Sequence, residues 1–564
     1  MDAAQLIASR PEVSLEAKHS SDSGKHHDIK EGEDGKKGRR RMNKKKDEGN
    51  GKRRKKLSKM KHYWLGKAKE AKPDSEEDTG HTEPVVTSTE DTIEAAAPVR
   101  PEPSKQELIA AMESVVATLG DRAKFEESGV DSVLALMRVY SKDPLVQAEI
   151  CRLVMDLAAT ARNRAKIREA GGILLVVLTM QTHMKEHNVQ TWASGALRKL
   201  AIDPLNRQRI VDIGGIECIL SAMLQHPDKA NLQEQGCAAL YNLSLGEGRP
   251  SHKYLAAETG RVEIQQNGGI PVVIRAMKNF RDHPGVTAMA AGALGNIAFD
   301  DQNKNWVRDY GGLELIIDAL VHHTDDEVVE RSCGALRILS RNSINALDIA
   351  REGGIPALLQ VMETHRHHHL IQEYSAACLQ NLAVDDFIRD RIVARGGVRR
   401  IVKAMYEHPT EAPLLAQCCA SLMNFATTDT NRLVMLSEGA VEAVLFAMQI
   451  KENAAIQEHS CAMLANMALN GKCAMKISEE GIKPILSAMA THSANPSVQE
   501  KACGAILNLS EFDVVRRRLN RKHAAQAIME AMENHPHHEG VRKYTSAALL
   551  RIMSDEGKTV PPTF

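Results

Sequence analysis

The chain repeats one hydrophobic pattern along most of its length. In one segment of each repeat, apolar residues return at helical spacing around a polar position, as Ile371, Ala376, Leu379 and Leu382 do around Asn381. Equivalent segments run from Asp156 to Arg551 at steps of 43, 43, 54, 42, 43, 43, 42, 42 and 43 residues. Such a regular register predicts an all-α solenoid of about ten units, in which each unit buries its apolar face against its neighbours.

A second pattern precedes that segment in most units. Glycine pairs or single glycines open an apolar stretch such as "GGIPALLQVM", where Ile355, Leu358, Leu359 and Met362 have i, i+3, i+4, i+7 spacing. The glycines favour a sharp turn between two helices. A short helical stretch such as "DRIVAR" comes before them, and proline-containing loops follow. Each unit is therefore predicted to hold a first, a second and a third helix.

The repeated polar position serves here as position 0 of the third helix. On a helical wheel, the apolar positions −10, −5, −2 and +1 centre about 140° away from it. The asparagines at position 0 are therefore predicted to lie opposite the apolar face, and Ala or Gly at position −4 predicts a shallow channel beside each one. An amide offers a donor and an acceptor to an extended backbone. A structural asparagine that bonds to a neighbouring turn stays open as the alternative.

The two patterns together resemble armadillo repeats, from about residue 104 to 556. The matching words are G-G-I-x-x-[LIV]-[LIV]-x-x-[ML] and [VIL]-Q-E-x-[AGS]-[CA]-x-[AC]-L-x-N-[LI]-[AS]. The resemblance implies a right-handed α-solenoid of three-helix units whose third helices line a concave, peptide-binding groove. It also implies that the asparagines of this face hold an extended peptide: Asn242, Asn296, Asn381, Asn424, Asn466 and Asn508.

Two departures limit what the resemblance implies about the ligand. Importin-α-like members carry tryptophan at position −4, whereas this chain has Ala or Gly there in nearly every unit. Position −7, which runs from Glu149 through Trp192, Arg331 and Tyr374 to Tyr544, has no consistent charge. Neither a tryptophan array nor a basic groove is therefore predicted, and the chemistry of the ligand stays open.

Residues 1–103 differ sharply from the repeats. They hold few large apolar residues, so they are predicted to be a disordered arm. Within the arm, residues 25–72 carry twenty Lys/Arg against seven Asp/Glu, and an acidic spacer at 73–99 carries eight acids and no base. The repeats are predicted to span 104–556 and to be followed by a tail at 557–564. An insertion near 244–266 accounts for the 54-residue step between Asn242 and Asn296.

The basic part of the arm supports several predictions. Residues 36–61 hold fifteen Lys/Arg in 26 positions, as two clusters with a polar gap, which resembles a bipartite nuclear localisation signal. The same charges would bind nucleic-acid phosphates. A solvated tail and an autoinhibitory arm remain open as well. The residues concerned are Lys36, Lys37, Arg39, Arg40, Arg41, Lys44, Lys45, Lys46, Lys52, Arg53, Arg54, Lys55 and Lys56.

Candidate chemistry is sparse elsewhere in the chain. Six of the ten cysteines occupy the same position in their repeats, position −5. This recurrence predicts that they are small buried residues of a protein in a reducing compartment. Histidines gather in the loops before third helices, as in "THRHHHL", without metal-ligand spacing. No nucleophile–base pair, phosphate loop or membrane-spanning stretch is found. No catalytic residue, metal or cofactor is therefore predicted.

These observations predict a non-enzymatic scaffold or adaptor, cytoplasmic, nuclear or both, that binds protein or peptide segments in its groove. A nuclear RNA- or DNA-associated factor, tethered by the basic arm, is one alternative. A nuclear-transport-type adaptor is another, and the arm itself is a candidate ligand of a nuclear import receptor.

Overall fold

The computed structural model describes residues 122–245 and 254–553. Within these ranges the chain forms 29 helices, α3 to α31, and no strand. Ten of them are third helices, which begin after the loops; nine of them end one residue beyond position 0, and α31 ends two residues beyond it. The third helices are α4 (Pro144–Leu157), α7 (His187–Leu200), α10 (Ala230–Leu243), α13 (Pro284–Ile297), α16 (Asp326–Leu339), α19 (His369–Leu382), α22 (Ala412–Phe425), α25 (Ala454–Met467), α28 (Pro496–Leu509) and α31 (Glu539–Met553).

The remaining helices fill the first and second places of the units. The first helices are α5 (Ala161–Glu169), α8 (Pro204–Asp212), α11 (Tyr254–Gln266), α14 (Asp301–Asp309), α17 (Ser343–Arg351), α20 (Asp386–Ala394), α23 (Asp429–Ser437), α26 (Gly471–Glu480) and α29 (Asp513–Arg521). The second helices are α6 (Gly172–Thr182), α9 (Gly215–Gln225), α12 (Gly269–Asn279), α15 (Gly312–His322), α18 (Gly354–Thr364), α21 (Gly397–Glu407), α24 (Ala440–Ala447), α27 (Ile482–Thr491) and α30 (Ala524–Asn534). Helix α3 (Arg122–Val139) precedes α4 as one continuous helix, in a stretch that lacks a glycine pair.

The glycine pair explains the sharp turn between first and second helices. Gly353 has φ +88°, in the left-handed region where a side chain is strained. At Gly354 an added Cβ would lie 2.5 Å from the Ile349 Cγ2 atom, so the second glycine allows α18 to start directly against α17. The turn predicted from the glycines is therefore confirmed. The first glycine is needed for its left-handed backbone conformation, and the second is needed because no side chain fits between the two helices.

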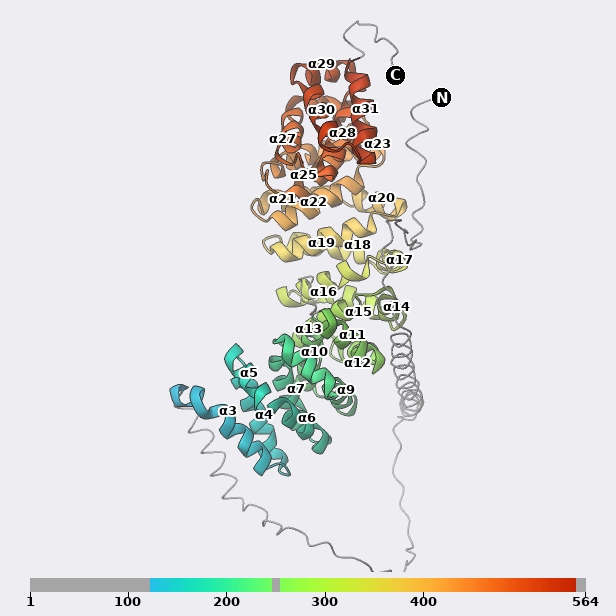
Figure 1. Cartoon of the computed structure of the whole chain (residues 1–564). Coiled ribbons are helices and arrows are strands. Elements are labelled where there is room, and N and C mark those ends of the chain that lie inside the picture. Colours follow the sequence, from blue (N-terminus) through green and yellow to red (C-terminus); the bar gives the residue numbers. More distant parts are fainter. Residues whose placement is uncertain (1–121, 246–253, 554–564) are drawn as a thin grey trace, which may run out of the picture. The chain divides into compact units, whose positions relative to one another are not determined.

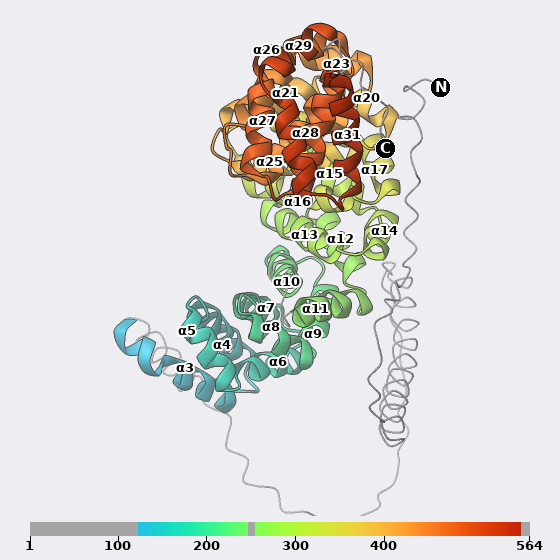
Figure 2. The same cartoon turned by 45° about the horizontal axis from the view of Figure 1, so that its top comes forward.

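The units pack by like helices. Each third helix between α7 and α28 lies against the third helices of the two neighbouring units, the terminal α4 and α31 each lie against one, and each second helix packs on the third helix of its own unit. The helices follow one another in chain order from α3 to α31 in Figure 1, and again in the turned view of Figure 2. This arrangement confirms the predicted all-α, armadillo-type solenoid and its number of units.

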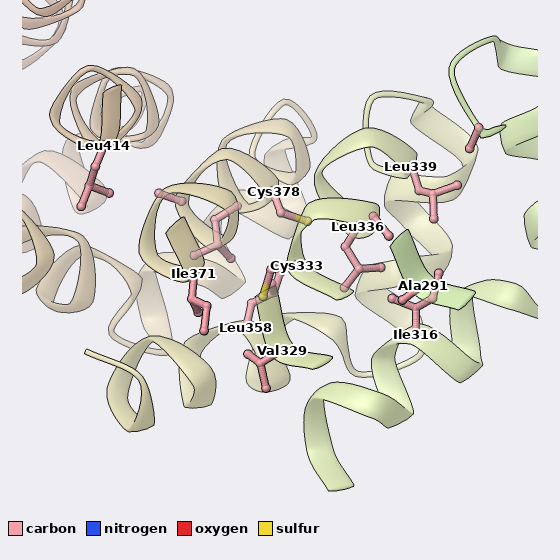
Figure 3. Close-up of a cluster of buried hydrophobic side chains, with 14 of the residues drawn as sticks. Ala291, Ile316, Val329, Cys333, Leu336, Leu339, Leu358, Ile371, Cys378 and Leu414 are labelled. Carbon is pink, nitrogen blue, oxygen red and sulfur yellow. The ribbon is translucent and has the colours of Figure 1, made fainter. Parts of the chain in front are cut away.

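The predicted apolar positions form a continuous core. In α16, Val328, Cys333, Leu336 and Leu339 occupy positions −10, −5, −2 and +1, and all four side chains are fully buried. Figure 3 shows Cys333, Leu336 and Leu339 among side chains of neighbouring helices. Because the same positions are apolar in most units, with Ser194 and Ser546 as exceptions at position −5, the core is shared between units rather than enclosed in each one.

The long step lies at α11. This helix has 13 residues where most first helices have nine, and the preceding residues 246–253 fall outside the described ranges. At Gly260 an added Cβ would lie 2.3 Å from the Leu243 backbone oxygen, so glycine lets α11 approach the end of α10. The predicted insertion thus coincides with a lengthened first helix.

The predicted arm at 1–103 and the predicted tail at 557–564 lie outside the described residues.

Candidate functional site

The asparagines at position 0 all make the same contact between units. Each side-chain Nδ2 donates a hydrogen bond to the backbone oxygen at position −1 of the preceding third helix. The pairs are Asn242 with Arg198 (2.9 Å), Asn296 with Tyr241 (3.4 Å), Asn381 with Arg337 (3.1 Å), Asn424 with Gln380 (3.1 Å), Asn466 with Met423 (3.0 Å) and Asn508 with Ala465 (2.8 Å). Carbonyls in the last turn of a helix lack intrahelical donors, so each asparagine caps its neighbour.

The side-chain oxygen of each asparagine, Oδ1, does not take part in these contacts between units. All six asparagines are half-buried, and within residues 122–245 and 254–553 no hydrogen bond to their Oδ1 atoms is found. Because a carbonyl can only accept, the bond to it also fixes which side-chain atom is nitrogen. The asparagines therefore combine both sequence interpretations: they lie opposite the core, and they also bond to a neighbouring turn.

The predicted channel at position −4 is wrong for most of the units. Ala238, Ala377, Ala420 and Ala462 are at most 7% exposed, so no open space lies beside the asparagines there. Side chains from adjacent third helices cover this position. At Gly334, for example, an added Cβ would lie 3.5 Å from the Tyr374 ring, which comes from position −7 of the next unit. A wheel of one helix does not include these neighbours, and for that reason the prediction failed.

A contact between α10 and α16 crosses the intervening helix α13. The Arg331 Nη1 atom donates to the Tyr241 hydroxyl, and the guanidinium carbon lies 4.5 Å from the centre of the Tyr241 ring. Both side chains stand over Gly292, where an added Cβ would be 3.0 Å from the ring and 3.3 Å from Arg331 Cδ. We call the Tyr241–Arg331 pair the clasp. It covers the position one turn before Asn296.

The face formed by α19, α22, α25 and α28 has a different composition. Gln417 donates from its amide to the Gln380 side chain, and Lys501 forms an ion pair with Glu500 at 2.7 Å. Burial lowers the pKa of His459 below its usual value, which favours the neutral imidazole. The side chains at positions −7 and −1 of this stretch are therefore uncharged or paired with a neighbour.

The glutamine of the Q-E pair in the third-helix motif makes a second contact that recurs from unit to unit and that the sequence did not predict. At position −9, Gln372 Nε2 donates to the backbone oxygens of Met362 and His365, both at 3.0 Å, where the second helix ends. The same bonds are made by Gln147, Gln190, Gln233, Gln457 and Gln499. The sequence did contain a sign of this contact, because a glutamine recurs at position −9, on the apolar side of the helical wheel, where an unpaired polar side chain would be unfavourable.

The loop histidines also connect units. His226 Nε2 lies 2.9 Å from the Met184 backbone oxygen in the preceding unit, and His183, His323, His408, His492 and His535 make the equivalent contact. His365 is the exception: its Nε2 atom is buried and has no hydrogen-bond partner. The loop that the equivalent contact would reach, between α15 and α16, has three residues where most of its counterparts have four.

The cysteines are structural, as the repeated position predicted. All ten are free, and nine of them are buried. Burial raises the pKa of the Cys151, Cys237 and Cys333 thiols to about 12, so these groups stay protonated and unreactive at neutral pH. The Cys333 sulfur lies 3.4 Å from the Ser375 hydroxyl of the next third helix.

Several predictions concern features that the described residues do not contain. The basic residues of the arm, from Lys36 to Lys56, lie outside them. Among residues 122–245 and 254–553, no group of three or more His, Cys, Asp or Glu side chains is arranged to hold a metal ion. No helix in these ranges is both long enough and apolar enough to cross a lipid bilayer.

Comparison with known sequences identifies the repeat. Residues 300–341 match the Armadillo/beta-catenin-like repeat, and these residues span one unit, α14 to α16. The chain is similar to human Armadillo repeat-containing protein 6, at 29% identity over 139 residues, covering 23% of this chain and 28% of that protein. It is also similar to Protein aardvark of Dictyostelium discoideum, at 32% identity over 141 residues, covering 22% and 19%. The matches thus span under a third of either relative.

Comparison with solved structures covers most of the array. An engineered protein matches with a TM-score of 0.64 and 23% identity, over 75% of this chain and 98% of that one. A chain solved in work on the phosphorylation-controlled interaction between cadherin and beta-catenin matches with a TM-score of 0.57 and 12% identity, over 81% and 98%. The fold is an α-solenoid of three-helix units. One of these units, at residues 300–341, matches the armadillo repeat in sequence.

Proposed function

We propose that the chain is a non-enzymatic scaffold or adaptor, and that its position-0 asparagines hold extended segments of partner proteins. The observation that carries this proposal is the row of half-buried amides, each fixed by its Nδ2 atom and each with an Oδ1 atom free of hydrogen bonds within the described residues. An extended segment presents backbone N–H groups at regular intervals. Fixed acceptors along a face bind such donors with little regard to side chains.

The similarity to a chain from work on the cadherin–beta-catenin interaction supports a protein partner, although it is a likeness of fold. The geometry also changes the chemistry that the sequence suggested. Because each Nδ2 atom caps the preceding helix, the amide supplies chiefly an acceptor to the ligand. Methylation of the ligand's backbone N–H groups should therefore weaken binding more than replacement of its side chains does.

Substitution of two adjacent asparagines tests the proposal. Peptides selected on the 564-residue chain from a displayed library of random twelve-residue sequences supply the ligand. The double variant Asn381→Ala with Asn424→Ala should raise the Kd of a selected peptide about tenfold or more, since two hydrogen bonds to the peptide backbone are lost. Fluorescence polarisation measures the Kd, and circular dichroism verifies that the helical content is unchanged.

A matched control separates binding from stability. Gln372→Ala with Gln457→Ala also removes two inter-helix side chains from the same stretch, but these glutamines are buried on the opposite, apolar side. This pair should lower the unfolding temperature and leave the Kd within about twofold. If the asparagine and glutamine pairs affect the Kd equally, the asparagines are structural caps and the proposal is wrong.

The basic arm motivates a second candidate function, in the nucleus. The clustering of fifteen Lys/Arg in residues 36–61 is the observation in its favour. Deletion of residues 36–61 should abolish nuclear accumulation if an import receptor reads the clusters, and should abolish crosslinking to RNA or DNA if they bind phosphates. Loss of nuclear accumulation alone would identify the arm as a localisation signal and would exclude a nucleic-acid tether.

A further inference from the structure

The asparagine row is interrupted, and the interruption divides the third helices into two stretches. Asn242 and Asn296 lie on α10 and α13, Ile338 occupies position 0 of α16, and four asparagines then follow without a gap on α19, α22, α25 and α28. Arg551 ends the row on α31. The longest uninterrupted run of amides is therefore Asn381, Asn424, Asn466 and Asn508.

The clasp obstructs the shorter stretch. Tyr241 and Arg331 meet above Gly292, one helical turn before Asn296, and Gly292 is buried beneath them. Glu327 lies 3.6 Å from the second terminal nitrogen of Arg331 and helps to hold its side chain. The Asn296 bond to Tyr241, at 3.4 Å, is also longer than those of the other five asparagines. A segment passing along α13 would have to displace the Tyr241–Arg331 hydrogen bond to reach Asn296.

The longer stretch has no such crossing contact in the described residues. Its side chains at position −1, which include Met423, Ala465 and Leu507, are uncharged, and Lys501 is paired with Glu500. Apolar residues are exposed just beyond the ends of two of its third helices, where Val384 is 70% and Leu469 is 42% exposed. The remaining charged groups beside these positions, Glu373 and Glu458, are carboxylates, so this surface offers an acidic segment no compensation for lost water, whereas it suits an uncharged one.

We propose that α19, α22, α25 and α28 form the binding surface, that its ligand is an uncharged extended segment of another protein, and that the clasp keeps α13 closed. This inference rests on the proposed function. The length of the segment follows from packing distances: three inter-helix steps of roughly 8–10 Å each correspond to roughly seven to nine residues of extended chain. The asparagine oxygens accept from the backbone of the segment, and the exposed apolar residues contact its side chains.

Two asparagine pairs test the location of the surface with the selected peptides described above. Asn424→Ala with Asn466→Ala should raise the Kd about tenfold or more, while Asn242→Ala with Asn296→Ala should raise it less than about twofold. The central residues of the selected peptides should carry no cluster of charge. Equal losses from both pairs, or selected peptides that are consistently acidic or basic, would overturn the inference while leaving the proposed function intact. If neither pair changes the Kd, the proposed function itself fails.

Thiol labelling tests the clasp without any ligand. In a Cys218→Ser background the remaining native cysteines are all buried, so a maleimide reports on an introduced thiol. Asn296→Cys should react about fivefold or more slowly than Asn424→Cys, because the Tyr241–Arg331 hydrogen bond must open before the reagent can approach along α13. Adding Arg331→Ala should remove the difference. Equal rates with the clasp intact would show that α13 is open and would contradict its closure.

Discussion

Helices α10 to α16 and helices α19 to α28 share one core pattern and differ on the opposite face. Leu336 in the first stretch and Leu379 in the second occupy position −2, and both are fully buried. On the other side, the first stretch has the clasp and Ile338, whereas the second has four consecutive asparagines. Because the two faces lie about 140° apart on the helix, residues on one can change without repacking the other. A repeat array can therefore keep its fold while separate parts of it acquire different surfaces.

Core substitutions at matched positions should produce the largest effects. Phe425 in α22 and Ile297 in α13 both occupy position +1 and are fully buried. Phe425→Ala should cost roughly 3–5 kcal/mol and Ile297→Ala roughly 2–5 kcal/mol of unfolding free energy, because each leaves a cavity. Chemical denaturation should show both losses, but only Phe425→Ala should weaken peptide binding. Equal weakening by Ile297→Ala would remove the functional difference between the two stretches.

Glutamine substitutions should have a smaller effect that is the same in both stretches. Gln233→Ala and Gln457→Ala each leave two backbone oxygens without their side-chain donor. The expected cost is roughly 1–3 kcal/mol each, measured by thermal or chemical unfolding. Neither change should alter the Kd for a selected peptide by more than about twofold. A large effect of Gln457→Ala on the Kd would mean that binding depends on the second helices as well.

An added asparagine should lengthen the active stretch. In Ile338→Asn, the register places the new Nδ2 atom beside the Gly295 backbone oxygen, as the other asparagines are placed on their neighbours. One more acceptor next to Asn381 should lower the Kd of a selected peptide roughly two- to tenfold. Lys199→Asn is the matched control, since it adds an amide on the far side of the clasp. If both substitutions strengthen binding equally, the clasp is not a boundary.

The smallest expected effect is a pH dependence at the junction of the two stretches. Burial lowers the pKa of His365 below its ordinary 6.5, although Asp326 acts in the opposite direction. The unfolded chain then binds a proton more readily than the folded one, so this contribution to stability is present above pH 6.5 and is lost as the pH falls through the lowered value. Unfolding temperatures measured from pH 7.5 downwards should decline less in His365→Gln than in the wild type. An identical decline would exclude His365 as the cause.

The sequence was sufficient for the fold because its information is periodic. Spacing alone predicts the buried face formed by Val328, Cys333, Leu336 and Leu339, and the glycine pair Gly353–Gly354 predicts the turn before the second helix. The surroundings of the asparagines were less predictable. A wheel places Asn381 away from the core, but it cannot show that Tyr374 from α19 lies over Gly334 of α16 or that Arg331 reaches Tyr241 across α13. Such contacts join residues in different units, and no spacing within one helix encodes them.

The hydrogen bonds between units also give the array a direction. In both the asparagine and the histidine rows, the donor belongs to the later unit and the acceptor is a backbone oxygen of the earlier one. Removal of units from the carboxyl end would leave helix ends uncapped, whereas removal from the amino end would free only side chains that water can satisfy. On the ribosome the chain is made from the amino end, so each unit as it emerges completes the one synthesised before it. The order of synthesis and the order of capping therefore coincide.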